Sequence, residues 1–204
     1  MHLETLVEER SAEAALSHLL PRILGTEISF AIYSHRGKMD LLAKLPQRMR
    51  GYARWMPDNW RILILTDADG RDCLPQKEVL ESVVRASGLL TRSSGGPGGR
   101  FQVSTRLAIE ELEAWFLGDV EALCSAYPRL SPTLAWQAPY RDPDAVRGGT
   151  WEALERELQR AGYHAGGLSK IKAAREISVH MDPARNRSRS FQVFREGLLK
   201  LISG

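Results

Sequence analysis

Acidic side chains directly follow two segments whose residues are typical of β-strands. Glu8 and Glu9 follow the first segment, and Asp67 and Asp69 follow the second, residues 61–66. Each acidic turn alone would be ordinary, but two of them, each after a strand, indicate a cluster of carboxylates. Clustered carboxylates repel one another and need a positive charge nearby. Mg²⁺, or Mn²⁺ in its place, prefers oxygen ligands, so Glu8, Asp67 and Asp69 are predicted to bind it.

The elements that must position these carboxylates alternate along the first hundred residues. Segments rich in β-branched and aromatic residues are separated by segments with a helical stripe of apolar residues. This alternation predicts an α/β fold with a mostly parallel sheet of about four strands, flanked by helices. Because parallel strands end at one edge of the sheet, Glu8, Asp67 and Asp69 are expected to lie together there. The predicted strands are residues 2–7, 28–33, 61–66 and 101–109.

The second half of the chain has mainly helical patterns. Residues 1–120 are therefore predicted to form the α/β domain, and residues 121–204 a mainly helical C-terminal extension packed on the same domain. Pro21 is expected to end or kink the first helix, which Ser11 would cap, and Pro46 to kink or split the second. Loops are predicted at 91–100 and 136–150, and helices at 11–20, 39–55, 76–86, 113–116, 151–161, 169–180 and 190–202.

Further polar residues are expected at the same edge of the sheet. Glu113 follows the fourth predicted strand and is a candidate ligand for a second metal ion; alternatively it is a solvated residue of an amphipathic helix. Arg36 and Lys38 follow the second strand and are candidates for binding phosphate, with His35 as a possible proton carrier. A solvated basic loop is the alternative for this segment, because it lacks the glycine spacing of a P-loop.

Four segments resemble known families. Residues 6–13 (LVEERSAE) and 64–69 (ILTDAD) resemble the two acidic motifs of TOPRIM domains. Residues 112–119 (LEAWFLGD) and 186–194 (NRSRSFQVF) resemble segments of the bacterial domain-of-unknown-function family 4276, which is similar to the TOPRIM domain of overcoming-lysogenization-defect-type nucleases. Many TOPRIM proteins have Gly where this chain has Glu9, so either Glu8 or Glu9 faces the metal; Glu8 is favoured.

The resemblance implies a TOPRIM-like (Rossmann-like) fold and Mg²⁺-dependent phosphoryl transfer in which Glu8, Asp67 and Asp69 are catalytic. A nuclease that cleaves DNA or RNA with water is the leading hypothesis, because the chain shows no extra domain for a tyrosine nucleophile. The resemblance also implies a role in bacterial defence against phage with a separate ATPase protein, since the chain has no Walker motif. Two alternatives stay open: a non-catalytic module that binds nucleic acid or an ATPase, and a metal-dependent phosphatase or nucleotide hydrolase.

The composition is that of an ordinary soluble protein. The hydrophobic share is 43%, the charged share is 26% and the net charge is +3. Cys73 and Cys124 are the only cysteines, which predicts reduced thiols in the cytoplasm, and no segment resembles a membrane span or secretory signal.

The C-terminal part of the chain is the more basic part: residues 141–204 hold 12 Lys/Arg against 8 Asp/Glu. The alternating arginines at 185–189 are either a phosphate-binding patch or a solvated surface, and Lys170 and Lys172 are expected to be exposed.

Overall fold

The computed structural model describes residues 1–69, 72–95 and 99–203. At its centre lies a four-stranded sheet in the order β2-β1-β3-β4, and every neighbouring pair of strands is parallel. The predicted α/β, Rossmann-like class is confirmed, with an entirely parallel sheet where a mostly parallel one was expected. The strands are β1 (His2–Val7), β2 (Ser29–Ser34), β3 (Trp60–Asp67) and β4 (Val103–Ala108).

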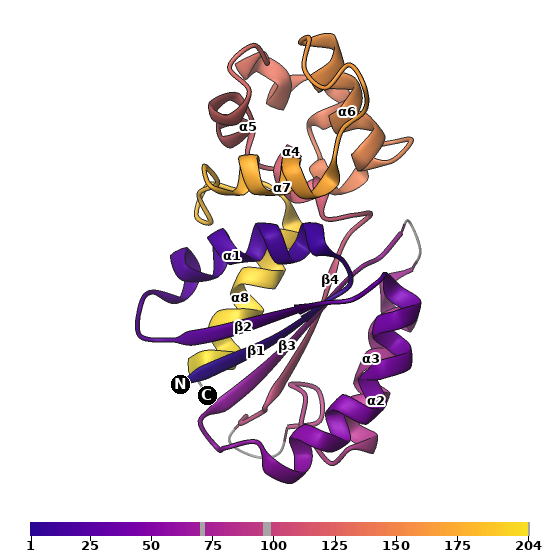
Figure 1. Cartoon of the computed structure of the whole chain (residues 1–204), viewed down its shortest axis with the longest axis vertical. Coiled ribbons are helices and arrows are strands. Elements are labelled where there is room, and N and C mark those ends of the chain that lie inside the picture. Colours follow the sequence, from indigo (N-terminus) through magenta and orange to yellow (C-terminus); the bar gives the residue numbers. More distant parts are fainter. Residues whose placement is uncertain (70–71, 96–98, 204) are drawn as a thin grey trace.

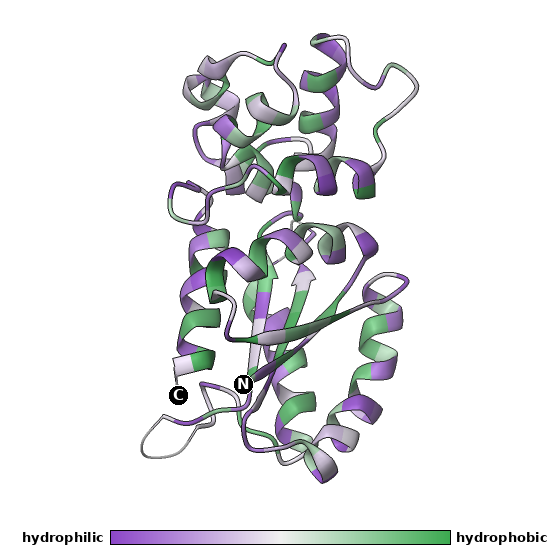
Figure 2. Ribbon diagram, turned by 60° about the vertical axis from the view of Figure 1, so that its left-hand side comes forward, coloured by the Kyte–Doolittle hydropathy of each residue, from purple (hydrophilic) through white to green (hydrophobic). Residues whose placement is uncertain are grey.

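Two pairs of helices cover the two faces of the sheet (Figure 1). The pair α1 (Arg10–Leu24) and α8 (Arg189–Ser203) covers one face, and the pair α2 (Lys38–Trp55) and α3 (Cys73–Ala86) covers the other. Apolar residues are concentrated in the strands and on the sides of the helices that face them (Figure 2). This burial of apolar surface is the main driving force for the three-layer arrangement.

Both helices with an internal proline continue past it. α1 extends to Leu24 with Pro21 inside it, and α2 is one continuous helix around Pro46. The helix is therefore not split at Pro46, because buried residues on either side of it, among them Leu45 and Met49, pack against the sheet. That packing offsets the hydrogen bond that the proline cannot donate.

A helical cap, residues 113–178, lies over the edge of the sheet where the strands end (Figure 1). Residues 136–150, predicted as a loop, contain short 3₁₀ turns. After the cap the chain returns to the sheet as α8. The cap consists of α4 (Glu113–Leu117), α5 (Val120–Ala126), α6 (Thr150–Arg160) and α7 (Lys170–Ser178), with 3₁₀ turns at Pro132–Trp136, Ala138–Tyr140 and Pro143–Ala145. Within the described ranges, no helix combines the length and apolar character that crossing a membrane requires.

The junction between cap and sheet is built from two segments far apart in the sequence, 112–119 and 186–194. Trp115 Nε1 donates a hydrogen bond to Ser190 Oγ at 2.9 Å, and Asn186 Nδ2 donates to the Trp115 carbonyl at 2.8 Å. The Trp115 ring also packs edge-on against the ring of Phe191. These segments, noted in the sequence for their family resemblance, therefore hold α4 to the start of α8.

Candidate active site

Glu8 lies at the carboxyl end of β1 and turns toward β3. It is partly buried, and its Oε2 accepts a hydrogen bond from the backbone N–H of Asp67 at 3.2 Å. Glu9, the next residue, is exposed and occupies the N-cap position of α1, which begins at Arg10 and not at the predicted cap Ser11. The carboxylate of Glu8, and not that of Glu9, therefore faces the end of β3.

Lys38 holds the turn that follows β3. Its Nζ donates to the Asp67 carbonyl at 2.5 Å and forms an ion pair with the carboxylate of Asp69, which is exposed. Lys38 thus contacts the acidic turn itself, whereas the sequence had suggested phosphate as its binding partner. Asp69 and Glu110 have left-handed backbones, with φ of 51° and 61°, and the Asp69 N–H donates to the Glu110 carbonyl at 2.8 Å. Asp69 and Glu110 thus pair just beyond the ends of β3 and β4, and non-glycine residues in this conformation recur at functional sites.

Glu113 brings a buried carboxylate to the same edge from the first turn of α4. Its side chain is only about 1% exposed, and Glu113 Oε2 has no hydrogen-bond partner among the described residues. Burial raises the pKa of Glu113 to about 7. The pKa of Asp67 is also raised well above its usual range, first by burial and then by the charges of Glu113 and Glu8. The structure therefore gathers Glu8, Asp67 and Glu113 into one poorly compensated acidic cluster.

Two residues that lie beside this cluster, Lys170 and Glu111, were not predicted as site residues. Lys170, at the start of α7, was expected to be exposed, but it is partly buried and its Nζ lies 3.1 Å from Glu111 Oε1. Glu111 Oε2 in turn accepts hydrogen bonds from Thr150 Oγ1 at 3.2 Å and the Trp151 N–H at 3.0 Å, the first residues of α6. No local pattern marks these residues, because their proximity depends on how the cap folds back over the sheet.

The residues fit a divalent cation in donor chemistry. Glu8, Asp67 and Glu113 offer hard carboxylate oxygens, and the orphaned Glu113 Oε2 is a buried acceptor of the kind that a cation satisfies. Among the residues that the structure describes, no group of three or more His, Cys, Asp or Glu side chains is arranged to hold a metal ion. Holding a cation would therefore require these carboxylates to draw closer together.

Arg36 and His35 lie at the end of β2 without joining this cluster. Arg36 is exposed, and its backbone N–H donates to Asp40 Oδ2 at 3.1 Å. His35 is buried, with its Nδ1 at 2.8 Å from the Val7 carbonyl, a separation that places the proton on Nδ1. This hydrogen bond joins the end of β2 to the end of β1. His35, suggested from the sequence as a proton carrier, therefore makes a structural contact.

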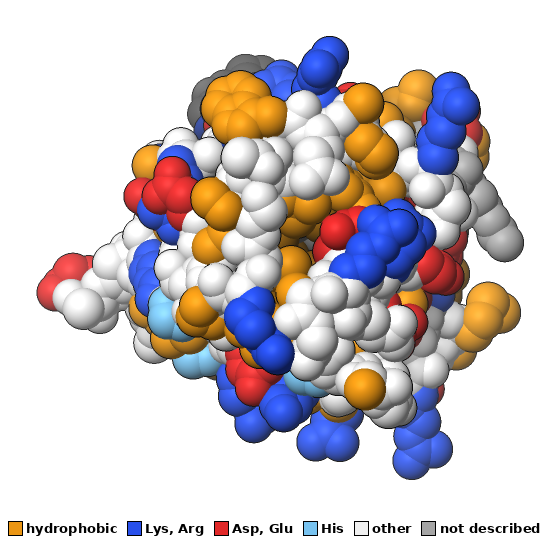
Figure 3. Space-filling model, turned by 90° about the horizontal axis from the view of Figure 1, so that it is seen from above, with side chains coloured by type: hydrophobic (Ala, Val, Ile, Leu, Met, Phe, Trp, Pro, Cys, Tyr) orange, Lys and Arg blue, Asp and Glu red, His pale blue; other side chains and the backbone are white. Residues whose placement is uncertain are grey.

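The arginines of the C-terminal segment are largely committed to the cap. Arg185 Nε lies 2.8 Å from Asp119 Oδ1, and Arg187 Nη1 donates to the Ala135 carbonyl at 3.3 Å. On the face seen from above the cap, Lys and Arg side chains are interspersed with acidic and apolar ones (Figure 3). Arg185 and Arg187 therefore stabilise the cap, which weakens the interpretation of this segment as a phosphate-binding patch.

Comparison with known proteins adds one finding to this geometry. Residues 7–199 match the family described as Domain of unknown function (DUF4276). The chain belongs to this family. The match to DUF4276 includes Glu8, Asp67, Glu113 and Lys170, so the whole candidate site lies within the family's domain. No curated protein and no solved structure matches the chain.

Proposed function

We propose that this DUF4276 protein is a Mg²⁺-dependent phosphoryl-transfer enzyme, and specifically a nuclease that cleaves DNA or RNA phosphodiesters with water. The observation that carries the proposal is a poorly compensated set of carboxylates at the carboxyl edge of a parallel sheet, in which Glu113 is buried and Glu8 and Asp67 are partly buried. A folded protein keeps such charges together at a cost in stability, which a bound cation would offset. The likeness of residues 6–13 and 64–69 to TOPRIM motifs supports the same reaction class.

The site residues divide into two roles. Glu8, Asp67 and Glu113 would hold the cation, which when bound polarises a phosphate and lowers the pKa of a water nucleophile. Lys38 keeps the turn at Asp69 in place, since its Nζ contacts both the Asp67 carbonyl and the Asp69 carboxylate. Glu8 Oε2 accepts a hydrogen bond from the Asp67 N–H, which fixes the Glu8 carboxylate beside the turn that Lys38 holds.

The experiment is a cleavage assay with purified protein, Mg²⁺ or Mn²⁺, and a panel of plasmid DNA, single-stranded DNA, tRNA and nucleotides. We expect cleavage of a nucleic acid that EDTA abolishes. Glu8→Gln should lose this activity, whereas the matched variant Glu9→Gln, which alters an exposed neighbour, should keep it. Metal-dependent cleavage that persists in Glu8→Gln would overturn the site. Nucleic-acid binding without any cleavage would instead indicate a non-catalytic module.

One observation favours a second candidate, a metal-dependent nucleotide hydrolase or phosphatase. The cap lies over the edge at which Glu8 and Asp67 meet (Figure 1), and a covered edge suits a small substrate or a chain end better than continuous duplex DNA. Release of phosphate from nucleotides, with plasmid and tRNA left intact, would identify this function in the same assay.

The cellular setting follows from the family resemblance alone. We infer a cytoplasmic protein that acts in defence against phage beside a separate ATPase, since the sequence contains no Walker motif of its own. Co-purification of the tagged chain from its native host, with ATPase activity measured in the eluate, tests this inference. A tagged chain that elutes alone and without ATPase activity would contradict it.

A further inference from the structure

Lys170 is the positive charge that the cap delivers to the acidic cluster. Its Nζ lies 3.1 Å from Glu111 Oε1 and 3.9 Å from Glu113 Oε2, and it faces the ring of Trp151 at 5.1 Å. The aromatic ring and the two carboxylates fix the ammonium group from different sides. Lys170 is therefore a located side chain and not a freely solvated one.

The helix that carries Lys170 is held at its opposite end as well. Arg22 of α1 donates hydrogen bonds to the carbonyls of Ser178 at 3.0 Å and Met181 at 2.8 Å, at the C-terminal end of α7. A guanidinium at this end of a helix satisfies carbonyls that have no partner within the helix. The position of Lys170 over the cluster is thus set by the docking of α7 on α1.

The contacts of Lys170 leave the cluster only partly compensated. Glu111 receives the direct ion pair, while Glu113 Oε2 is buried without a hydrogen-bond partner among the described residues. Lys170 also offsets part of the repulsion that Asp67 experiences from Glu113 and Glu8. An ammonium group and a divalent cation would therefore draw on the same carboxylate charges.

We propose that Lys170 is a positioning residue that competes with the divalent cation for Glu113. When no cation is bound, its ammonium group compensates the charges of Glu111 and Glu113. When a cation binds, the Glu113 carboxylate turns to the cation and Lys170 keeps its ion pair with Glu111. The inference rests on the proposed function, because it assumes that Glu113 and Asp67 hold a cation. Since Glu111 also binds the first residues of α6, this exchange would couple cation binding to the seating of the cap. Coupling of this kind is reciprocal, so removing the lysine charge should strengthen cation binding.

Isothermal titration with Mn²⁺ tests the competition without relying on activity. We expect Lys170→Met to lower the Kd for Mn²⁺ at least about fivefold, and Lys170→Arg, which keeps the charge, to stay within about twofold of the unmodified protein. Lys172→Met is the matched control, because Lys172 lies on the same helix with its side chain about 60% exposed and pairs with Glu176 at 3.8 Å. Its Kd should not change.

Thermal unfolding with and without Mn²⁺ separates the competition from a purely structural ion pair. Lys170→Met should have a lower Tm than the unmodified protein in EDTA, and Mn²⁺ should restore the difference, because the cation then compensates the carboxylates. An unchanged Kd together with a Tm deficit that Mn²⁺ does not reverse would mean that Lys170 only fastens the cap.

The same titration distinguishes this failure from that of the proposed function. Asp67→Asn removes a predicted ligand and should abolish Mn²⁺ binding. If Asp67→Asn does so while Lys170→Met binds like the unmodified protein, the metal site stands and the competition is refuted. If neither the unmodified protein nor Lys170→Met binds Mn²⁺, both proposals are refuted. Binding by Lys170→Met alone would support the competition in its strongest form.

Discussion

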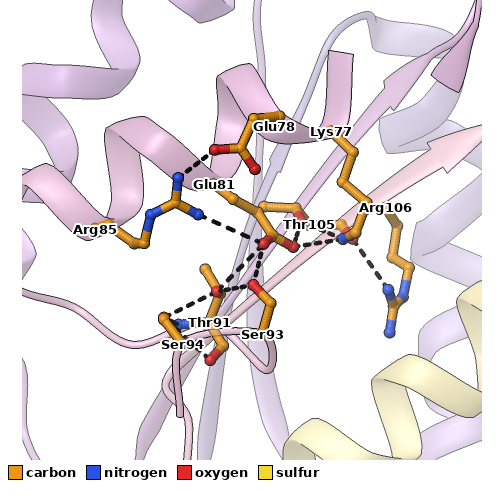
Figure 4. Close-up of polar contacts among 9 residues, drawn as sticks. All are labelled: Lys77, Glu78, Glu81, Arg85, Thr91, Ser93, Ser94, Thr105 and Arg106. Atoms are coloured by element: carbon orange, nitrogen blue, oxygen red, sulfur yellow. Dashed lines mark hydrogen bonds and ion pairs between the residues drawn. The ribbon is translucent and has the colours of Figure 1, made fainter. Parts of the chain in front are cut away.

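Two buried glutamates flank β4 in opposite electrostatic states. Glu81, on α3, is about 6% exposed, and its carboxylate is surrounded by donors (Figure 4). Lys77 Nζ lies 2.6 Å from it, Thr105 Oγ1 donates at 3.1 Å, and Ser93 donates as well. Burial alone would raise the pKa of Glu81, but these donors more than offset that effect and the pKa is lowered. Glu81 therefore joins α3, β4 and the turn at 91–94 into one stable unit.

Glu113 is buried even more completely but lacks such donors. Its pKa is raised to about 7 by burial, and the attraction of Lys170, 3.9 Å away, only partly opposes that rise. The comparison shows that burial by itself does not decide what a carboxylate does; the supply of donors does. Glu81 is stabilised by its donors, whereas the charge of Glu113 is left for a bound ligand to compensate if the proposed function is correct.

The largest expected effect is on activity at the poorly compensated edge. Asp67→Asn should reduce the metal-dependent activity by roughly 10³-fold, because it removes one of the charges that we propose to hold the cation. Initial rates on the substrate found in the cleavage assay measure the loss. The control is Asp58→Asn, an exposed residue just before the other end of β3, which should retain full activity. Equal rates for the two variants would contradict the assignment.

The next effect is on stability at the well-compensated glutamate. Glu81→Ala should lower the free energy of unfolding by about 3 kcal/mol, because it removes the one carboxylate that Lys77, Ser93 and Thr105 share and leaves the partly buried Lys77 charge without its counter-charge. Urea unfolding at pH 7 measures it. Glu78→Ala, on the exposed side of the same helix, should cost less than about 0.5 kcal/mol, although Glu78 forms an ion pair with Arg85. A similar loss in both variants would refute the distinction.

The fold was predictable because its signals are local. The alternation of strand-like and helical segments indicated the parallel sheet, and residues 61–66 lie within β3 as observed. Where the sequence failed, tertiary packing overrode a local rule: α2 continues through Pro46 because its apolar side is buried. The placement of the cap over the carboxyl edge had no local signal.

For the same reason, only the part of the candidate site that follows the strands could be predicted from the sequence. Glu8 and Asp67 directly follow strands, so the topology of a parallel sheet brings them together. Glu111 and Lys170 are 59 residues apart and meet through the fold of the cap, which no spacing rule anticipates. The alternating arginines at 185–189 suggested phosphate binding, yet the contacts of Arg185 and Arg187 are within the protein.

The two glutamates should also respond to pH with opposite signs. In EDTA, Glu113 stabilises the fold while protonated, so stability should fall by on the order of 2 kcal/mol as the pH rises from about 4.5 through about 7. Glu113→Gln should remove this loss and be more stable than the unmodified protein at pH 8. Urea unfolding across this range measures the difference. A Glu113→Gln variant that is no more stable at pH 8 would mean that Lys170 compensates the Glu113 charge in full and not in part.

The smallest effect separates the lysine of the Glu81 network from its hydroxyl groups. Lys77→Met should cost only about 1 kcal/mol at pH 7, because Ser93 and Thr105 still donate to the Glu81 carboxylate. Since the pKa of Glu81 is lowered partly by Lys77, the variant should also lose less stability on acidification below about pH 4.5 than the unmodified protein does. Urea unfolding between pH 3 and pH 7 measures both quantities, with the exposed Lys44→Met as control. A loss as large as that of Glu81→Ala would show that the ion pair, and not the hydroxyl donors, keeps this glutamate charged.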